Sequence, residues 1–443
     1  MSGPGAGRRF LLLQGPSSFF FSHLGDALDE RGAEVRRLHL SPGDALFWRR
    51  PGGRSYRGRA AEWPGFVRRF MAEEGITDLV YLGARRPAHA EARAEARALG
   101  VRRWHVELGY ARPDWLTVEP EGGGADGTFP EHWPGIEALA RGPVPEETPL
   151  WRSSFAAYAA MDVAWNLSNL TLAPLTHPGY RRHQTWHPLA EYGGFLWTKA
   201  RERSDAAHAG RVLTAWRGRR KFLFPLQLRT DYQIRAHGPD ADLRETVRRV
   251  VASFTAEAPP EARLILKEHP QDNGLTPWRR IAKAAAGAAA ERVEVIRGGD
   301  LAAMLDETVG VVTVNSTVGL SALRAGVPAK ALGRAIWDRE GLTDPRPLAA
   351  FWHGPRPPDP GRVEILLRAL GWATQVRGTF DGPGAAAGAA AVAERLTAPA
   401  RLPFRAGSAP DRTPGVNASA SAPSAPRRSA RPPARPRGGS RSS

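Results

Sequence analysis

Residues 9–40 read RFLLLQGPSSFFFSHLGDALDERGAEVRRLHL, and this stretch decides the fold class. The apolar runs at 9–13 and 35–40 have strand character, and the segment at about 19–31 places apolar residues at helical spacing. A strand, a helix and a second strand in this order predict a βαβ unit, in which the two strands lie parallel in one sheet.

The same alternation continues on both sides of a middle region rich in glycine and proline. Before that region, strands are predicted at 78–82 and 103–106, with helices at 63–74 and 88–99. Residues 151–200 are expected to be mostly helical. Beyond residue 220 the expected elements are strand 222–226, helix 243–256, strand 263–267, helix 278–290, strand 293–296, strand 310–314 and helix 318–325. The sequence therefore predicts an α/β protein with two Rossmann-like, parallel-sheet domains that face a central cleft.

A chain of 443 residues fits two folded domains, which we place at 1–205 and 206–400. Cysteine is absent, which excludes disulfides, thiolate metal sites and cysteine nucleophiles. The apolar run near the start is too short to span a bilayer and is not followed by a signal-peptide pattern, so we expect a cytoplasmic protein.

The net charge of +17 favours an acidic partner such as nucleic acid, anionic lipid or a nucleotide sugar. Residues 401–443 carry nine Arg and one Asp in a segment rich in Ser, Ala and Pro, which predicts a disordered tail. This tail is either a solvated appendage or a segment attracted to an anionic membrane surface, at about 1 kcal/mol per basic residue.

Ligands of open parallel sheets bind at the carboxyl ends of the strands, so the residues that follow each strand are the candidates for a site. Asn315, Ser316 and Thr317 follow the strand at 310–314 and precede a helix. Their hydroxyl and backbone N–H groups could bind a phosphate at the helix N-terminus, and the alternative is an ordinary Ser or Thr N-cap.

His269 and Pro270 directly follow the strand at 263–267. The proline ends the strand and places the imidazole at the ligand edge of the second sheet, whereas a structural histidine is the other interpretation.

Glu107 follows the strand at 103–106, and Asp231 follows the strand at 222–226. One carboxylate that exchanges protons and one that attacks or stabilises a sugar carbon are what glycosyl chemistry needs. Asp231 could instead cap a helix. Arg112 and Arg235 lie a few residues downstream and could hold an acidic donor or acceptor by bidentate hydrogen bonds.

Metal chemistry has little support in the sequence. Asp240 and Asp242 resemble a metal-binding aspartate pair, but they open a helix and are better read as caps. No phosphate-binding P-loop motif is present. We therefore expect no metal and no cofactor.

The sequence as a whole resembles the bacterial capsule polysaccharide biosynthesis/export family, and most closely its KpsS-type branch. The resemblance runs over about residues 9–350 in the expected order. It rests on the opening FLLLQGP at 10–16 with Phe19-Phe20, on GDALFW at 43–48, on Glu107-x-Gly109-Tyr110-x-Arg112-Pro113-Asp114-Trp115, on Pro225-Leu226-Gln227-Leu228-x-x-Asp231, on Lys267-x-His269-Pro270 and on Asn315-Ser316-Thr317-Val318-Gly319.

This resemblance implies a GT-B glycosyltransferase that uses CMP-Kdo. Members build a short β-linked Kdo linker on (lyso)phosphatidylglycerol at the inner face of the cytoplasmic membrane, with retention of configuration. Peripheral membrane contact and other capsule assembly proteins as partners are implied with it. CMP is a good leaving group, which agrees with the absence of a metal motif.

Carried over by position, Glu107 is the acid/base residue and Asp231 the nucleophile. The residues implied to bind the CMP phosphate are His269, Pro270, Asn315, Ser316 and Thr317. The residues implied to bind substrate are Gln14, Gly15, Arg112, Gln227, Arg235 and Lys267. The sequence departs from the family pattern at Leu108, where a second acidic residue is usual.

Two other interpretations belong to different functional classes. One is a non-catalytic export or assembly component that keeps the fold. The other is a nucleic-acid-binding protein, which the Arg-rich tail suggests but which lacks any recognised groove-reading or RNA-binding module. We therefore expect no nucleic-acid partner.

Overall fold

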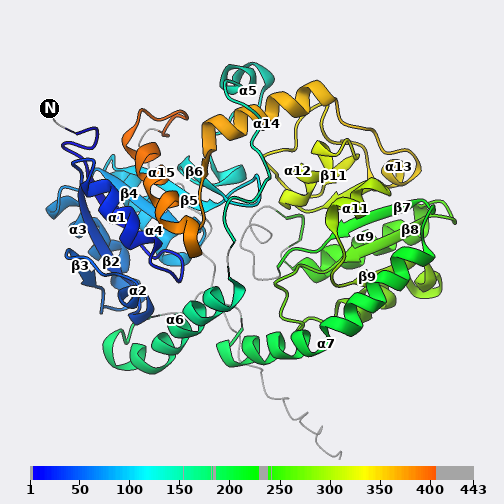
Figure 1. Ribbon diagram of the computed structural model, residues 1–443, viewed down its shortest axis with the longest axis horizontal. Coiled ribbons are helices and arrows are strands. Elements are labelled where there is room, and N and C mark those ends of the chain that lie inside the picture. The colour runs from blue at the N-terminus through cyan, green and yellow to red at the C-terminus, as the bar shows by residue number, and fades with distance from the viewer. Residues whose placement is uncertain are drawn as a thin grey trace, which may run out of the picture. The chain divides into compact units, whose positions relative to one another are not determined.

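The computed structural model describes residues 3–152, 154–180, 182, 186–228, 238–240 and 242–405 (Figure 1). It contains two separate sheets, with helices packed against them, so the predicted α/β class with two Rossmann-like units is confirmed. The described part extends five residues into the predicted tail. Leu402 is buried there, and the ring of Phe404 packs edge-on against Trp104.

The first sheet has seven strands in the order β12-β6-β5-β4-β1-β2-β3. β1 to β5 run parallel, whereas β6 is antiparallel to both of its neighbours. β3, β6 and β12 were not predicted from the sequence. The strands are β1 (Arg9–Leu12), β2 (Glu34–His39), β3 (Gly53–Ser55), β4 (Asp78–Leu82), β5 (Arg102–Leu108), β6 (Trp115–Pro120) and β12 (Gln375–Arg377).

Successive side chains of β1 point to opposite faces of the sheet, as the two-residue period of a strand requires, and so belong to different hydrophobic cores. Phe10 and Leu12 pack with α1 and α15, and Leu11 packs on the other face with α3 and α4. Both faces are covered, which explains why the strands read as continuous apolar runs. The helices on this sheet are α1 (Phe20–Asp29), α2 (Pro42–Leu46), α3 (Trp63–Glu73), α4 (Pro87–Ala98) and α15 (Ala385–Thr397).

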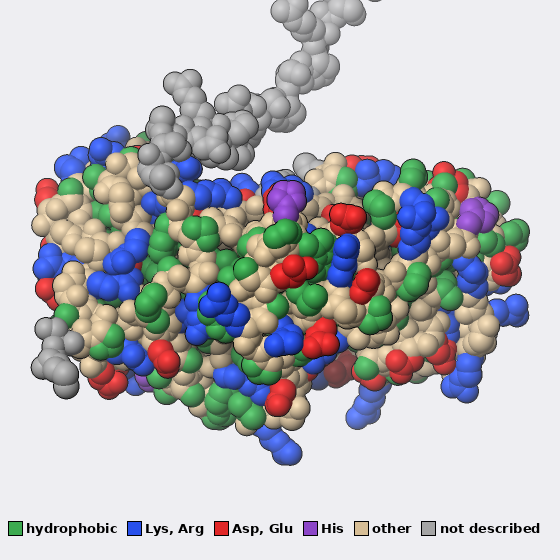
Figure 2. All heavy atoms as spheres, turned by 90° about the horizontal axis from the view of Figure 1, so that it is seen from above, with side chains coloured by type: hydrophobic (Ala, Val, Ile, Leu, Met, Phe, Trp, Pro, Cys, Tyr) green, Lys and Arg blue, Asp and Glu red, His purple; other side chains and the backbone are tan. Residues whose placement is uncertain are grey.

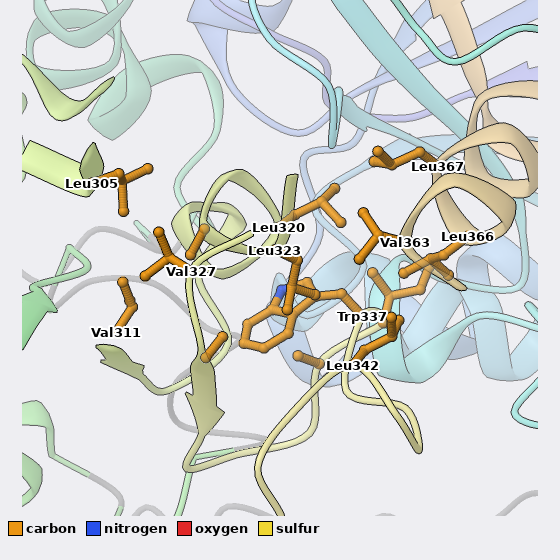
Figure 3. Packing of buried hydrophobic residues seen from close by; sticks show 14 of the residues in the cluster. Leu305, Val311, Leu320, Leu323, Val327, Trp337, Leu342, Val363, Leu366 and Leu367 are labelled. Atoms are coloured by element: carbon orange, nitrogen blue, oxygen red, sulfur yellow. The ribbon is translucent and has the colours of Figure 1, made fainter. Parts of the chain in front are cut away.

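The second sheet has five strands, all parallel, in the order β11-β10-β7-β8-β9. One face packs against α9, α10 and α13. The other packs against α11, α12 and α14, and Figure 3 shows residues of this second cluster. The elements are β7 (Lys221–Pro225), α9 (Leu243–Glu257), β8 (Arg263–Lys267), α10 (Trp278–Ala286), β9 (Val293–Ile296), α11 (Leu301–Asp306), β10 (Thr308–Thr313), α12 (Thr317–Arg324), β11 (Ala329–Ala331), α13 (Leu348–His353) and α14 (Pro360–Thr374).

The segment between the two sheets is helical, as predicted, and consists of α6 (Phe155–Thr176) and α7 (Pro188–Ala215). The predicted end of the first domain, at residue 205, lies within α7. A shorter helix, α5 (Trp133–Leu139), joins the core of the second sheet through Ile136, and Trp133 Nε1 donates to the Glu340 carbonyl at 3.1 Å. No helix within the described ranges combines the length and the apolar character needed to cross a bilayer.

The last elements of the described chain return to the first sheet. β12 pairs with β6, and α15 packs on α1 in a core that holds Leu24, Leu28 and Leu396. Arg8 donates a hydrogen bond to the Leu396 carbonyl near the end of α15 and forms an ion pair with Asp78. The first sheet is therefore built from both ends of the folded chain.

Acidic and basic side chains are interspersed on the face in Figure 2.

Leu396→Ala should destabilise the protein by about 2–5 kcal/mol, because the removed atoms leave a cavity between α15 and α1. Leu175→Ala is the matched control, since that leucine is 83% exposed and its truncation should change the free energy of unfolding by about 0.5 kcal/mol or less. Urea unfolding of both variants measures the difference. Equal losses would mean that α15 does not stabilise the first sheet.

Candidate functional site

The predicted site of the second sheet lies where three neighbouring parallel strands end. Gln227 follows β7, His269 follows β8 and Asn315 follows β10, and these strands are adjacent in the order β10-β7-β8. Because parallel strands end at a common edge, the three residues share the carboxyl edge at which α/β sheets bind ligands.

Gln227 and Asn315 are brought together by two reciprocal hydrogen bonds. Gln227 Nε2 donates to Asn315 Oδ1 at 2.9 Å, and the Asn315 backbone N–H donates to Gln227 Oε1 at 3.3 Å. The side-chain amides thus connect the segments that follow β7 and β10, four residues beyond the last backbone pair, Leu223 with Val311. This fixes the backbone that leads into Ser316 and Thr317.

Ser316 is the N-cap of α12, so the capping interpretation is confirmed: its Oγ accepts a hydrogen bond from the Val318 N–H at 3.2 Å. The Ser316 carbonyl accepts from Trp337 Nε1 at 3.1 Å, and Gly319 lies so close to that indole that a Cβ would collide with it. A hydroxyl that accepts from a backbone N–H keeps its own O–H for a phosphate oxygen. Capping and anion binding are therefore compatible at Ser316, and Thr317 is only half-buried beside it.

His269 presents its Nε2 side for binding. Its Nδ1 accepts a hydrogen bond from the Gln271 N–H at 3.1 Å, which assigns the proton of the neutral ring to Nε2. Burial lowers the pKa of His269, and the positive charge of Arg112 lowers it further. The imidazole is therefore a neutral N–H donor near pH 7. Pro270 is exposed beside it.

Arg112 connects the first sheet electrostatically to this edge, because its charge acts on His269. It lies in the turn between β5 and β6, and its Nε donates to the Gly109 carbonyl at 3.2 Å. The turn needs glycine at 109, since a Cβ there would lie 2.6 Å from the Trp115 carbonyl oxygen. Lys267, the last residue of β8, is buried, which lowers the pKa of its ammonium group.

Glu107 does not lie in a loop after its strand, as we had expected. β5 continues to Leu108 because β6 turns back and pairs with it, and Glu107 faces Thr117 across that antiparallel pair. The Glu107 carboxylate remains 42% exposed, and its Oε2 lies 3.9 Å from His105 Nε2. The position within the strand therefore leaves the carboxylate accessible.

Gln14 and Gly15 lie at the carboxyl end of β1 and are packed within the first sheet's own structure. The Gln14 side-chain amide donates to Asp44 at 3.1 Å and accepts from Arg86 at 2.9 Å. A Cβ on Gly15 would lie 2.7 Å from the Phe21 ring. The structure thus gives Gln14 a role in ordering this edge. Asp231 and Arg235 lie outside the described residues, and their roles stay predictions.

Sequence reasoning missed Glu119, which lies on β6 opposite His105. Burial raises its pKa to about 8. Glu119 accepts hydrogen bonds from Tyr110 Oη at 3.3 Å and from the Gly124 N–H at 3.2 Å, and these lower the pKa but do not offset the effect of burial. Its Oε1 has no hydrogen-bond partner in the described ranges. A glutamate inside the apolar run of β6 was the available signal, and strongly perturbed carboxyl groups are concentrated at functional sites.

The other candidates play structural roles or lie elsewhere. Asp242 caps α9 by accepting from the Arg244 N–H at 3.0 Å, which confirms the capping interpretation. Within the part of the chain that the structure describes, no three His, Asp or Glu side chains are grouped to hold a metal. A cavity of about 200 Å³ opens beside Lys221 and Thr308, at the amino-terminal edge of the second sheet, and so has no part in this site.

Comparison with known proteins gives the family. Residues 77–381 match the family described as "Capsule polysaccharide biosynthesis protein". The chain belongs to this family. The capsule polysaccharide export protein KpsS of Escherichia coli is 30% identical over 366 residues, which cover 80% of this chain and 92% of KpsS.

A second relative of this capsule biosynthesis protein is the capsule polysaccharide modification protein LipB of Neisseria meningitidis serogroup B. It is 29% identical, over 84% of this chain and 91% of LipB. Among solved structures, the β-Kdo 2,7 transferase of KpsC from Thermosulfurimonas dismutans aligns over 82% of this chain and 90% of its own, at 15% identity and a TM-score of 0.40.

The raised pKa of Glu119 makes stability depend on pH in a defined direction. The folded protein keeps a proton on Glu119 up to about pH 8, whereas the unfolded chain releases it near 4.5, so stability should fall between these values as pH rises. The loss should be on the order of 1 kcal/mol per pH unit. Glu119→Gln should remove this slope in thermal melts from pH 5 to 8.5, and Glu137→Gln, at an exposed glutamate of α5, should retain it. An unchanged slope in Glu119→Gln would place the titration elsewhere.

Proposed function

We propose that this capsule biosynthesis protein is a retaining glycosyltransferase that transfers Kdo from CMP-Kdo to a (lyso)phosphatidylglycerol acceptor. The observation that carries the proposal is the common edge at which Gln227, His269 and the Asn315–Thr317 segment follow three adjacent strands. Membership of the capsule polysaccharide family supports a role in making or modifying capsule polysaccharide.

In this proposal the second sheet binds the CMP part of the donor. His269 offers a neutral Nε2–H, and Ser316 and Thr317 offer hydroxyl and backbone N–H groups at the positive end of α12. Lys267 and Arg112, whose charges both act on His269, add positive charge near the imidazole. Kdo carries a carboxylate, for which the guanidinium of Arg112 is a suitable bidentate partner.

The chemical step needs two carboxylates with different environments. Asp231 attacks the anomeric carbon of Kdo and displaces CMP, which leaves with the bonding electron pair. Glu107 then takes the proton of the acceptor hydroxyl as that oxygen attacks the same carbon and releases Asp231. Two displacements in sequence retain the configuration. The partial exposure of Glu107 suits a residue that exchanges protons with solvent and acceptor.

The proposed acceptor accounts for the charge of the chain. Phosphatidylglycerol and CMP-Kdo are both anionic, and the net charge of +17 attracts both of them. Peripheral contact with the inner face of the cytoplasmic membrane, and contact with other capsule assembly proteins, belong to the same proposal. The alternative function is a non-catalytic export component, which the name of the Escherichia coli relative suggests.

Binding of CMP tests the second sheet. His269→Ala and Ser316→Ala should each weaken CMP binding by roughly 10- to 150-fold, the effect of losing one charge-assisted hydrogen bond. Ser154→Ala is a matched control, because Ser154 caps α6 in the same way and its loss should cost similar stability without affecting CMP. Calorimetric titration of the three variants gives the comparison. Equal affinity in all three would exclude the α12 edge as the donor site.

Transfer of Kdo tests the two carboxylates. Asp231→Asn and Glu107→Gln keep the size of each side chain but remove its charge. CMP-Kdo should still bind, while transfer to a fluorescent phosphatidylglycerol analogue falls by several orders of magnitude. The mass of the acceptor after incubation shows whether one Kdo unit was added.

The same assay separates enzyme from export component. A wild-type protein that binds CMP-Kdo but adds no Kdo to the acceptor would support the non-catalytic alternative. Transfer by Asp231→Asn within about tenfold of the wild-type rate would remove Asp231 from the mechanism.

A further inference from the structure

Helix α6 turns apolar side chains toward solvent on most of its circumference. Its buried stripe is narrow and consists of Trp165, Asn166, Asn169 and Ala173. Leucines occupy the remaining sides, and the most exposed of them is Leu175, at 83%. The usual arrangement of a surface helix is thus reversed, because polar amides lie inside and leucines outside.

The buried stripe is sufficient to hold α6 in place. Asn169 Oδ1 accepts a hydrogen bond from the Gly43 N–H at 2.7 Å, and the Trp165 indole packs directly on Gly43, where a Cβ would not fit. Both contacts fix α6 to α2. The most exposed leucine, Leu175 at 83%, has little area in this attachment, so the apolar character of the outer side needs another explanation.

The first turns of α7 continue the same surface. Tyr192 of α7 donates its hydroxyl to Asp162 of α6 at 3.2 Å, and the two helices lie along the lower edge of Figure 1. Ten of the thirteen exposed large hydrophobic residues in the described ranges belong to these two helices. We call them the α6–α7 apolar face: Phe155, Tyr158, Val163, Leu167, Leu170, Leu172, Leu175, Leu189, Leu196 and Trp197.

Among the exposed side chains around this face, basic residues outnumber acidic ones. Of the described residues between 152 and 205, Glu202 is the one exposed acidic residue. Asp162, Glu191 and Asp205 are half-buried, and Asp162 is hydrogen-bonded to Asn166 and Tyr192. Five basic residues in the same span are exposed, namely Arg152, Arg182, Lys199, Arg201 and Arg203, and of these Lys199 pairs with Glu202 at 2.5 Å and Arg201 with Asp205 at 3.4 Å.

These features fit a lipid surface better than a protein partner. Leucines on several sides of one helix form a convex apolar surface, which has few hydrogen-bonding groups for a protein interface to satisfy. Trp197 lies two residues before Lys199, and an indole next to a cation is typical of the boundary between acyl chains and headgroups. A second copy of this chain would bring two sets of basic side chains together, and these would repel each other.

We propose that the α6–α7 apolar face docks on an anionic phospholipid bilayer. The leucines and Trp197 enter the outer part of the acyl region, and the surrounding Arg and Lys side chains pair with the phosphates. α2, which holds α6, directly follows the carboxyl end of β2, so the docked helix lies next to the ligand edge of the first sheet. Delivery of a lipid acceptor to that edge rests on the proposed function, whereas the docking itself does not.

Sedimentation of the full chain with vesicles tests the docking. Wild-type protein should bind vesicles of phosphatidylcholine and phosphatidylglycerol in a 7:3 ratio, a composition chosen to give roughly the anionic charge of a bacterial membrane surface. A triple variant, Leu167→Asp, Leu175→Asp and Trp197→Ala, should bind at least about tenfold more weakly, because each substitution removes apolar area from the bilayer or adds charge to it. All three residues are exposed, so circular dichroism and melting should not change.

Leu150→Asp provides the matched control. Leu150 is 57% exposed and Leu167 55%, but Leu150 lies outside the two helices, so its substitution should leave vesicle binding unchanged. Binding that persists in the triple variant and disappears at high salt would assign the attraction to the Arg-rich tail and overturn the proposal. Absence of wild-type binding, with a dimer that the triple variant dissociates, would assign the face to a second copy and overturn it as well. No sugar donor is present, so failure here is distinguishable from failure of the proposed transfer.

Discussion

Parallel pairing in the second sheet is the constraint on which the candidate site depends. A parallel strand can be reached only by a crossover, so each of β7, β8 and β10 is followed by a loop and a helix before the next strand begins. All three loops consequently start at one edge. The amide pair between Gln227 and Asn315 continues the connection between β7 and β10 beyond the backbone ladder, and the cap of α12 begins one residue later.

Burial, more than charge, sets the protonation states of His269 after β8 and of Glu119 in the first sheet. Both residues are held in their neutral forms: His269 as an imidazole with one ring proton, and Glu119 as a protonated carboxylic acid. The positive charge available to an anionic donor then comes from Arg112 and Lys267. A neutral histidine near these two cations donates a hydrogen bond without adding charge that would slow the release of a CMP product.

The sequence predicts the parts of this fold that have strong local signals. Strands such as β7 and β8 are continuous apolar runs because both faces of their sheet are covered, and Ser316 follows its strand at a typical capping position. β12 has three residues and α15 is mostly alanine, so neither has a pattern that points to a partner more than 250 residues away. Glu107 was misplaced for a related reason: the length of β5 depends on an antiparallel partner that follows it. The exposure of the leucines in α6 was also beyond prediction, since composition does not show which side of a helix is covered.

The return of β12 and α15 to the first sheet has a consequence for synthesis on the ribosome. The apolar side of α1 emerges before the second sheet is translated, yet α15, the helix that covers it, is made after that sheet. The whole second sheet must be translated before that cover exists. Phe20, Leu24 and Leu28 therefore stay uncovered by α15 while the second sheet is translated, when such surfaces are open to chaperones and to aggregation. Separate expression of the amino-terminal half would make this transient exposure permanent.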